Sequence, residues 1–470
     1  MDDYQQDHYQ VLWNNQLNRN WDLSFAGNYT RGRGFFELYQ GGASFARYQI
    51  EPLTIGGETI ESSDLIERRW LDNDFYFGSA AANYGSDNKK LNVNLGSAFS
   101  VYNGDHFGEV IWARFSSSTE QDDRYYENDA QKTDFNIFSK ASYQLAKKLT
   151  GFVDLQYRRV DYEFEGFDNT GNVITQNVDF NFFNPKLGLT YELNPQTSIY
   201  VYTGIGNKEP NRSDFVDTSP SSRPEHETVI DTEVGFKKTW QKGAIEANLY
   251  YLNYDNQLIL TGQINDVGEY ARINAEDSFR AGLELVAGYQ LTKQFDISSS
   301  LTLSRNRIRS FNEFIDSWDT GEQVEVEHGD TDLALSPNVL FNAYVNFDAL
   351  PAAKNHDLTF GLGTKFVGDQ FIDNTSNQNT SLPSYSFTDF KITYKVKTSF
   401  AKEIALKLLV RNIFDAQYIS SAWTYRYISE FYDGRPDDPS TRLEQGSTYN
   451  LTGYYPQAGR NFLLGLTLGF

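Results

Sequence analysis

The chain has 470 residues, with 41 Lys and Arg against 63 Asp and Glu, so its formal net charge is −22. A chain this acidic is a poor candidate for nucleic-acid binding, because phosphate contacts need clustered Lys and Arg. It has no cysteine, which excludes a disulfide scaffold, a thiolate zinc site and a cysteine nucleophile. Its five histidines form no His-x-x-x-His pair, so no histidine-rich metal centre is expected: His8, His106, His226, His328 and His356.

The N-terminus begins Met-Asp-Asp-Tyr-Gln-Gln-Asp-His, without the basic start and apolar core of a signal peptide. No stretch approaches the roughly 18 consecutive apolar residues of a transmembrane helix. A transmembrane β-barrel stays open at this point, because alternating strands keep the average hydropathy low.

Apolar side chains recur at every second residue in several segments. This period is the pattern of a β-strand with one apolar face and one small or polar face. The apolar faces carry Leu91, Val93, Leu95, Val339, Phe341, Val345, Leu406, Leu408, Leu464, Leu466 and Leu468. The opposite faces carry Asn92, Asn94, Asn342, Asn346, Lys407 and Arg411.

Two kinds of fold have such strands: a soluble sandwich or propeller, and a membrane barrel with its apolar face toward lipid. The barrel is favoured because the strands are long enough for a tilted membrane strand, at roughly ten residues or more. Their polar faces also suit a wet lumen. Aromatic residues gather toward strand ends, as the girdles of membrane barrels do: Tyr250, Tyr251, Tyr254, Tyr385 and Phe387.

The predicted connections alternate in length, as periplasmic turns and extracellular loops of outer-membrane barrels do. A sandwich or propeller has no reason to sort its loops in this way. Short connections are expected near 17–20, 85–88, 146–149, 194–196, 241–243, 292–294, 350–355 and 397–402. Long ones are expected at 35–69, 103–132, 166–176, 208–227, 262–272, 310–332, 371–382 and 421–457.

Counting between these connections predicts an all-β, antiparallel up-and-down transmembrane barrel wall of about seventeen strands. The last strand ends at Phe470 and descends toward the periplasm. Counting backward, the first strand, near 4–16, also descends and would begin outside the cell. We therefore expect that upstream sequence is missing, in agreement with the lack of a signal peptide.

The segment 412–418, Asn-Ile-Phe-Asp-Ala-Gln-Tyr, resembles the Asn-Leu-Phe-Asp-x-x-Tyr signature in the penultimate strand of TonB-dependent outer-membrane receptors, of the kind common in Bacteroidetes. Other stretches resemble further parts of the same barrel in the same order. They are 104–115 and 207–212 with 223–225 for loop elements, 184–191 for a mid-barrel strand, and 454–462 with Phe470 for the last strand.

The resemblance implies a barrel of about 22 strands that holds an N-terminal plug domain. Residues 1–470 would then be a partial barrel domain, roughly its sixth to last strand, without plug or signal peptide. The implied location is the bacterial outer membrane. The implied partners are lipid and lipopolysaccharide, the barrel-assembly machinery, a small-molecule chelate, and the inner-membrane TonB complex acting through the plug. This chain alone is expected to give at most weak ligand binding and no energised uptake.

Three sets of residues are candidate sites. The resemblance implies that the alternating C-terminus is a barrel-assembly signal, and an ordinary lipid-facing strand is the alternative: Phe462, Leu464, Leu466, Leu468 and Phe470. Five loop residues are candidates to face a ligand, with loop packing and ion pairing as the favoured alternative for each: Glu109, Trp112, Arg114, Arg212 and Asp214.

The third set is the loop 310–332, which carries eight carboxylates and no Lys or Arg between 310 and 332. Clustered carboxylates are hard ligands for divalent cations. The favoured alternative is a solvated loop near lipopolysaccharide phosphates, because EF-hand spacing is lacking.

The sequence has no catalytic triad pattern, phosphate loop or Gly-x-Ser-x-Gly motif, so no enzyme activity, cofactor or metal is expected. The resemblance implies energised uptake of a scarce, bulky nutrient, an iron–siderophore or similar chelate. A passive porin is the first alternative, and a surface receptor or adhesin that uses its long loops is the second.

Overall fold

The computed structural model describes residues 2–117, 123–216, 223–264, 270–351, 353 and 355–470. The chain divides into two compact units, which are described separately. Unit 1 comprises Met1–Leu145 and Gly151–Leu187, with Thr218–Ser221 outside the described residues. Unit 2 comprises Ala146–Thr150, Gly188–Asp217 and Ser222–Phe470.

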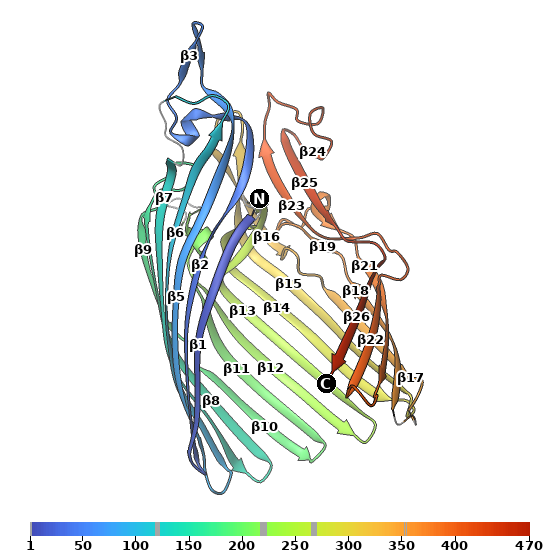
Figure 1. Ribbon diagram of the computed structural model, residues 1–470. Coiled ribbons are helices and arrows are strands. Elements are labelled where there is room, and N and C mark those ends of the chain that lie inside the picture. Colours follow the sequence, from blue (N-terminus) through green and yellow to red (C-terminus); the bar gives the residue numbers. More distant parts are fainter. Residues whose placement is uncertain (1, 118–122, 217–222, 265–269, 352, 354) are drawn as a thin grey trace. The chain divides into compact units, whose positions relative to one another are not determined.

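Unit 1 is built from long antiparallel strands that lie side by side (Figure 1). The hairpin β3–β4 stands at one end of them. Its elements are β1 (Asp2–Asn18), β2 (Trp21–Ser44), η1 (Phe45–Tyr48), β3 (Leu53–Ile55), β4 (Glu58–Ile60), β5 (Ser62–Gly85), β6 (Leu91–Ala113), β7 (Arg124–Ala146), β8 (Leu149–Gly166) and β9 (Gln176–Phe183).

Unit 2 continues with the same antiparallel up-and-down order. Its first elements are β10 (Lys186–Asn194), β11 (Thr197–Lys208), α1 (Arg212–Val216), β12 (Glu227–Trp240), β13 (Gly243–Ile264), β14 (Tyr270–Gln290), β15 (Phe295–Ser317), β16 (Gln323–Asp332) and β17 (Val339–Asp348). Its last are β18 (His356–Val367), β19 (Gln370–Phe371), η2 (Gln378–Thr380), β20 (Ser381–Leu382), β21 (Tyr385–Val396), β22 (Glu403–Arg411), β23 (Ile419–Ile428), β24 (Thr441–Gln445), β25 (Thr448–Pro456) and β26 (Asn461–Gly469).

The strand count agrees with the expectation of about seventeen. Among the described residues, the main sheet has 22 strand segments. Four pairs of segments continue one another along the chain after a short interruption, namely β9 with β10, β16 with β17, β22 with β23, and β25 with β26. The short β24 pairs with β25 as an addition to that hairpin. Merging these segments leaves seventeen strands.

The sheet is not closed among the described residues. β1 pairs along one edge with β2, and β26 pairs along one edge with β22. Each of these two strands therefore has a strand partner along one edge only among the described residues.

Several long connections were predicted with the wrong extent, because strands continue far into them. The segments 35–69 and 103–132 contain the ends of β2, β5, β6 and β7, and 310–332 is mostly the hairpin β15–β16 with a turn around Asp319. Alternation of apolar residues reveals a strand only where one face is apolar. Backbone pairing in an antiparallel hairpin continues past that zone whatever the side chains are.

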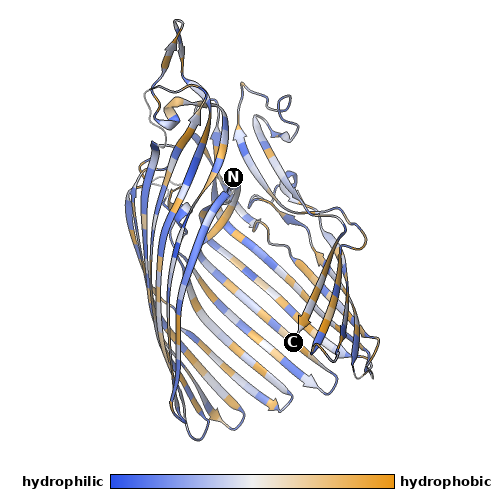
Figure 2. Cartoon of the chain, viewed as in Figure 1, coloured by the Kyte–Doolittle hydropathy of each residue, from blue (hydrophilic) through white to orange (hydrophobic). Residues whose placement is uncertain are grey.

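The two faces of the strands match the prediction. Leu466 lies opposite Leu406, and Leu464 opposite Leu408, so these apolar side chains share one face. Asn342 lies opposite Ser300 on the other face. Figure 2 shows polar and apolar residues alternating along β11 to β15. The period-two pattern therefore separates an apolar from a polar face.

Aromatic rings form rows across neighbouring strands, but the predicted clustering toward strand ends is only partly confirmed, because Tyr385 and Phe387 begin β21 whereas Tyr250, Tyr251 and Tyr254 lie within β13. In unit 1, Tyr9 stacks on Tyr29 and Tyr29 on Tyr76, at centroid distances of 5.8 and 5.0 Å. Trp21 packs on Tyr84 with ring centroids 4.9 Å apart. This pair lies eight residues from Tyr29 along β2 and eight residues from Tyr76 along β5. In unit 2 a matching row lies near the short turns: Phe295, Phe347, Phe360 and Phe390.

No helix among the described residues has the length and apolar character that a membrane crossing would require.

The apolar face of β26 provides a test of its predicted lipid contact. Leu466 is 65 % exposed and lies at the middle of the strand. We expect Leu466→Arg to destabilise the lipid-folded protein by about 2–4 kcal/mol, because a guanidinium near the bilayer midplane is poorly solvated. Folding into vesicles of known composition under a urea gradient measures this difference.

The matched control is Thr467→Arg, one residue further along β26 on the opposite face. This variant should cost much less. Equal effects of the two substitutions would contradict the assignment of the faces.

Candidate functional site

The tips of two hairpins in unit 2 join, although they are more than one hundred residues apart in the sequence. The end of β15 pairs in parallel with the end of β23, with Asp316 opposite Tyr427 and Ser317 opposite Ile428. The backbone N–H of Trp318 also donates to the carbonyl of Ile428 at 2.9 Å. The hairpin β15–β16 and the hairpin β23–β25 therefore hold each other in place.

The connection 368–384, between β18 and β21, packs against these hairpins. Its Ile372 and Leu382 are buried together with Ala422 of β23. The side chain of Asn374 accepts from the backbone N–H of Ala334 at 2.8 Å and donates to the carbonyl of Leu260. A hydrophobic contact and side-chain hydrogen bonds to two separate backbone segments thus fix this connection.

One glycine permits this close packing. Gly262 in β13 has φ +90°, a conformation that other residues rarely adopt. A Cβ atom at this position would lie 2.8 Å from the Thr424 side chain and 3.2 Å from Cβ of Asp373. Both the backbone conformation and the available space therefore require glycine.

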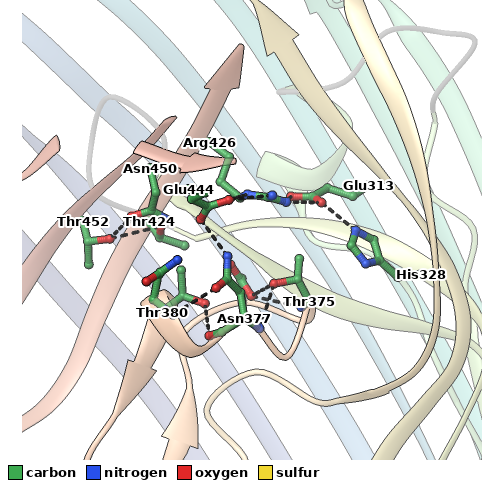
Figure 3. A network of polar contacts seen from close by, with 12 residues as sticks. Glu313, His328, Thr375, Asn377, Thr380, Thr424, Arg426, Glu444, Asn450 and Thr452 are labelled. Atoms are coloured by element: carbon green, nitrogen blue, oxygen red, sulfur yellow. Dashed lines mark hydrogen bonds and ion pairs between the residues drawn. The ribbon is translucent and has the colours of Figure 1, made fainter. Parts of the chain in front are cut away.

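Arg426 connects the three parts (Figure 3). Its guanidinium lies 2.5 Å from Oε2 of Glu313 on β15 and donates to Oε2 of Glu444 on β24 at 2.7 Å. Glu313 also contacts Nε2 of His328 at 2.7 Å, and Glu444 accepts from the amide of Asn377 in the connection at 2.7 Å. The side chains of Arg426 and Glu313 are 16 % exposed and that of Glu444 is 6 % exposed, so solvent screens these ion pairs weakly.

A smaller polar group lies beside this network. Asn450 of β25 donates to the hydroxyl of Thr424 at 2.7 Å, and the hydroxyls of Thr424 and Thr452 lie 3.3 Å apart. All three residues are buried. Their mutual hydrogen bonds satisfy polar groups that would otherwise be costly to bury.

Asp373 is the buried acid of the connection. It is 3 % exposed, and its Oδ1 accepts from the backbone N–H and the hydroxyl of Thr375, at 3.0 and 2.7 Å. Its Oδ2 has no hydrogen-bond partner. Burial raises the pKa of the Asp373 carboxyl to about 6, although the two bonds from Thr375 act in the opposite direction.

The acidic segment 310–332 is a structural hairpin, and most of its carboxylates have protein partners. Beyond Glu313, Asp316 accepts from the hydroxyl of Tyr425 at 2.7 Å, and Asp319 accepts from the hydroxyl of Ser429 at 2.7 Å. Arg307 contacts both Asp330 and Asp332, at 3.0 and 2.8 Å. Within the described parts of the chain, no group of three or more potential ligand residues is placed to hold a metal ion.

A polar pocket of about 520 Å³ lies on the face of unit 2 that carries the polar residues. Glu233 and Asn248 at its wall both accept from the hydroxyl of Tyr200, at 3.1 and 3.0 Å. The pocket is lined by Asp231, Glu233, Asn248, Tyr250, Leu252, Arg280, Glu284, Thr302, Ser304, Asn306, Leu335, Ser336, Pro337 and Leu340. Our sequence prediction missed this pocket, although its signal is present as polar residues at alternate positions of four consecutive strands.

Unit 1 has its own fixed connection between β2 and β5. Phe45 and Tyr48 of η1 are buried against Leu65 and Tyr125. The carboxylate of Glu67 is fully buried and accepts from Gln40 at 2.9 Å, from the hydroxyl of Tyr125, and from Arg69 at 3.4 Å. The long connections of both units are thus held by buried polar groups.

The five predicted ligand-facing residues lie in different places. In unit 1, Glu109 accepts from the indole of Trp70 at 2.8 Å, Arg114 pairs with Asp64 at 3.0 Å, and Trp112 is 46 % exposed. In unit 2, Asp214 of α1 is buried and pairs with Arg272 at 3.2 Å; Arg212 begins the same helix. Glu109, Arg114 and Asp214 therefore have structural partners, and their ligand contacts stay a prediction.

The predicted assembly signal lies on β26. Phe462, Leu464, Leu466, Leu468 and Phe470 are each between 49 and 76 % exposed. Such exposure is what a lipid-facing strand and a recognition signal both require, so the assembly role stays a prediction.

The Arg426 network provides a first test of this site. We expect Arg426→Ala to release the connection 368–384 and the β24–β25 tip, at a cost of about 3 kcal/mol, because Glu313 and Glu444 would be left buried without their partner. Hydrogen exchange of these segments measures the loss. Arg435→Ala is the control, since Arg435 pairs with the exposed Asp433, and it should change the exchange little.

The raised pKa of Asp373 provides a second test. In the packed connection the carboxyl titrates near pH 6, above its ordinary value of 3.8. The packed form of the connection 368–384 is therefore most stable relative to its open form below about pH 4. As the pH rises through 6, its free energy of opening falls by about 2–3 kcal/mol. Asp373→Asn should remove this pH dependence of hydrogen exchange in 368–384. An unchanged profile in the variant would assign the dependence to another group.

Known proteins share this architecture. The family model described as "TonB dependent receptor-like, beta-barrel" matches residues 1–413. The siderophore receptor PiuA from Acinetobacter baumannii has a similar fold, with a TM-score of 0.67 and 14 % identity over 99 % of this chain and 64 % of that one. The ferric-catecholate import receptor Fiu from E. coli K12, in its closed form, gives a TM-score of 0.63 at 14 % identity, over 98 % and 64 %.

The ferric citrate transporter FecA in its unliganded form gives a TM-score of 0.63 at 17 % identity, over 98 % of this chain and 62 % of that one. The chain therefore spans less than two thirds of the length of these receptors. At such low identity they show the fold alone. The match over residues 1–413 goes further and shows that the chain belongs to the TonB-dependent receptor-like β-barrel family.

Proposed function

We propose that this chain is part of an outer-membrane receptor that takes up a scarce, bulky nutrient, an iron–siderophore or a similar chelate, with energy supplied by TonB. The observation that carries the proposal is the family match over residues 1–413. Receptors with a similar fold are described as importing ferric catecholate and ferric citrate, and another as a copper transporter. The family is one of outer-membrane proteins, so the apolar strand faces contact lipid.

The connections of unit 2 support a receptor. The β15–β16 and β23–β25 tips are joined, and Arg426 and Asn377 attach the connection 368–384 to them. Ordering these segments costs conformational entropy during folding. A surface that recognises a ligand gains from this order, because segments that are already fixed lose less entropy when the ligand binds. A passive porin has no such need for a fixed, interlocked set of connections, so we place it second.

In the proposed role the protein binds and passes its ligand, and it performs no reaction. The polar pocket beside Glu233 and Arg280 offers acceptors and a donor on the side where a solute would travel. Its partners would be a small-molecule ligand and the TonB protein. A surface receptor or adhesin uses the same exposed connections, and energised uptake distinguishes it from the proposed role.

The test is growth on one chelated iron source in a strain that lacks its own receptors and expresses the receptor containing this chain. We expect growth that an uncoupler abolishes, because TonB-dependent uptake draws on the inner-membrane proton gradient. Radioactive iron accumulation over minutes measures uptake directly.

Arg426→Ala is the informative variant, with Arg435→Ala as its control. The first should reduce uptake several-fold because it loosens the interlocked connections, and the second should leave it close to the parent level. Uptake that resists the uncoupler and rises linearly with ligand concentration would favour the porin. Cell-surface binding without accumulation would favour the adhesin.

A further inference from the structure

The joined tips of unit 2 carry an exposed aromatic surface, formed by Trp318, Phe431 and Tyr432. Trp318 stacks on Tyr427 with centroids 3.9 Å apart and planes at 11°, and Tyr432 stacks on Trp318 at 5.7 Å. Below them, Tyr427 stacks on Tyr449 at 5.2 Å, and both of these rings are buried. A rigid column of rings therefore begins in the interior and ends in solvent.

Three aromatic side chains at the outer end of this column and beside it in the sequence are accessible to solvent. Phe431 is 88 % exposed, Trp318 is 50 % exposed and Tyr432 is 40 % exposed. Single exposed aromatic residues are common on proteins, but here two stacked rings, with Phe431 next to Tyr432 in the sequence, stand on a fixed support, and such an exposed patch is of the kind that binds a ligand.

The polar atoms of these rings are already bonded within the protein. The indole N–H of Trp318 donates to the hydroxyl of Tyr425 at 3.0 Å, and the hydroxyl of Tyr432 donates to Asp437 at 2.8 Å. What the surface offers to a ligand is therefore mainly the aromatic ring area that stacking leaves exposed. The face of an aromatic ring carries negative charge density and attracts cations.

The rim of the surface is strongly acidic. The turn 317–322 and the segment 430–438 together contain six carboxylates, against one cationic side chain, Arg435. Asp319 accepts from the backbone N–H of Glu430 at 2.6 Å, and such bonds hold the pKa of its carboxyl below the ordinary value. Hydrogen bonds from Arg435 lower the pKa of Asp433 to about 2. The rim therefore keeps its negative charge across the physiological pH range.

We propose that Trp318, Phe431 and Tyr432 bind an organic cation, such as an alkylammonium or a cationic ring, carried by the nutrient that the receptor captures. Ring faces and carboxylates both favour a positive ligand, and the rim opposes an anionic one. A second copy of this chain is disfavoured as the occupant, because two surfaces with this charge would repel. The binding of a cation at this surface is argued from the surface alone, and only the statement that the nutrient carries this cation rests on the proposed function.

The first experiment compares choline with 3,3-dimethylbutan-1-ol, its neutral isostere, as probes of the chain in detergent micelles. Saturation-transfer NMR gives both affinities. We expect choline to bind about three- to tenfold more tightly, and the difference to shrink at high salt. Equal affinity for the two probes would overturn the proposal. So would tighter binding of the neutral maltohexaose or of citrate at this surface.

Variants locate the binding. Phe431→Ala should weaken choline binding several-fold without disturbing the fold, because this side chain is almost fully exposed. Trp318→Phe keeps a ring in the column and should weaken binding less than Trp318→Ala. Phe400→Ala is the matched control, since Phe400 is 70 % exposed in the short connection between β21 and β22. Choline binding that survives both Phe431→Ala and Trp318→Ala would overturn the proposal.

Collisional quenching gives an independent measurement of the charge around Trp318. The contribution of Trp318 to the fluorescence is obtained by subtracting the emission of Trp318→Phe from that of the parent chain. We expect caesium ions to quench it several-fold more efficiently than iodide, and stronger iodide quenching would overturn the proposal. Neither experiment needs transport, so failure of uptake with intact choline binding would overturn the proposed function alone.

Discussion

The connections of unit 2 depend on one guanidinium group. Arg426 lies between Glu313 and Glu444, and through them it holds a hairpin, a short strand and the connection 368–384. Each carboxylate would be expensive to bury alone, and each has a second partner, His328 for Glu313 and Asn377 for Glu444. The group is therefore stable only as a whole, which makes the three segments behave as one structure. The exposed aromatic column stands on that structure, because the strand pairing at Asp316 and Ser317 places Trp318 against Tyr427.

The strands themselves follow from a simpler constraint. A chain that crosses lipid must satisfy every backbone amide within the sheet, whatever its side chains are. Antiparallel pairing also continues where the sequence turns polar, as between 67–74 of β5 and 103–110 of β6, with one register shift between Ile66 and Glu67. The constraint on the backbone leaves side-chain polarity free to differ between the two faces. Leu464 and Leu466, two residues apart on β26, lie on the apolar face, whereas Lys407 of the neighbouring strand β22 lies on the other face.

The sequence predicted those features whose cause is local. The alternation in 91–101 or 462–470 is visible within a few residues, so the strands, their faces and their number were predictable. The ion pairs are different, because Arg426 and Glu313 are 113 residues apart and no local pattern links them. The same holds for Asp373, whose raised pKa comes from burial by segments that the sequence places far away. The five predicted ligand-facing residues were chosen by type and loop position, and no local pattern announced the partners that three of them have: Glu109, Arg114 and Asp214.

The acidic composition acquires two separate meanings in the structure. Some carboxylates are internal acceptors: Glu313 and Asp316 satisfy Arg426 and Tyr425, and are no longer available to a cation. Others lie at the rim of the aromatic surface, where only Arg435 offsets them. A count of acidic residues in 310–332 cannot separate these two groups, because the distinction depends on partners from 425–444. A carboxylate cluster in such a loop therefore says little about metal binding until its internal donors are known. The carboxylates without such donors lie near the aromatic rings of the tips, and this combination favours an organic cation as the ligand.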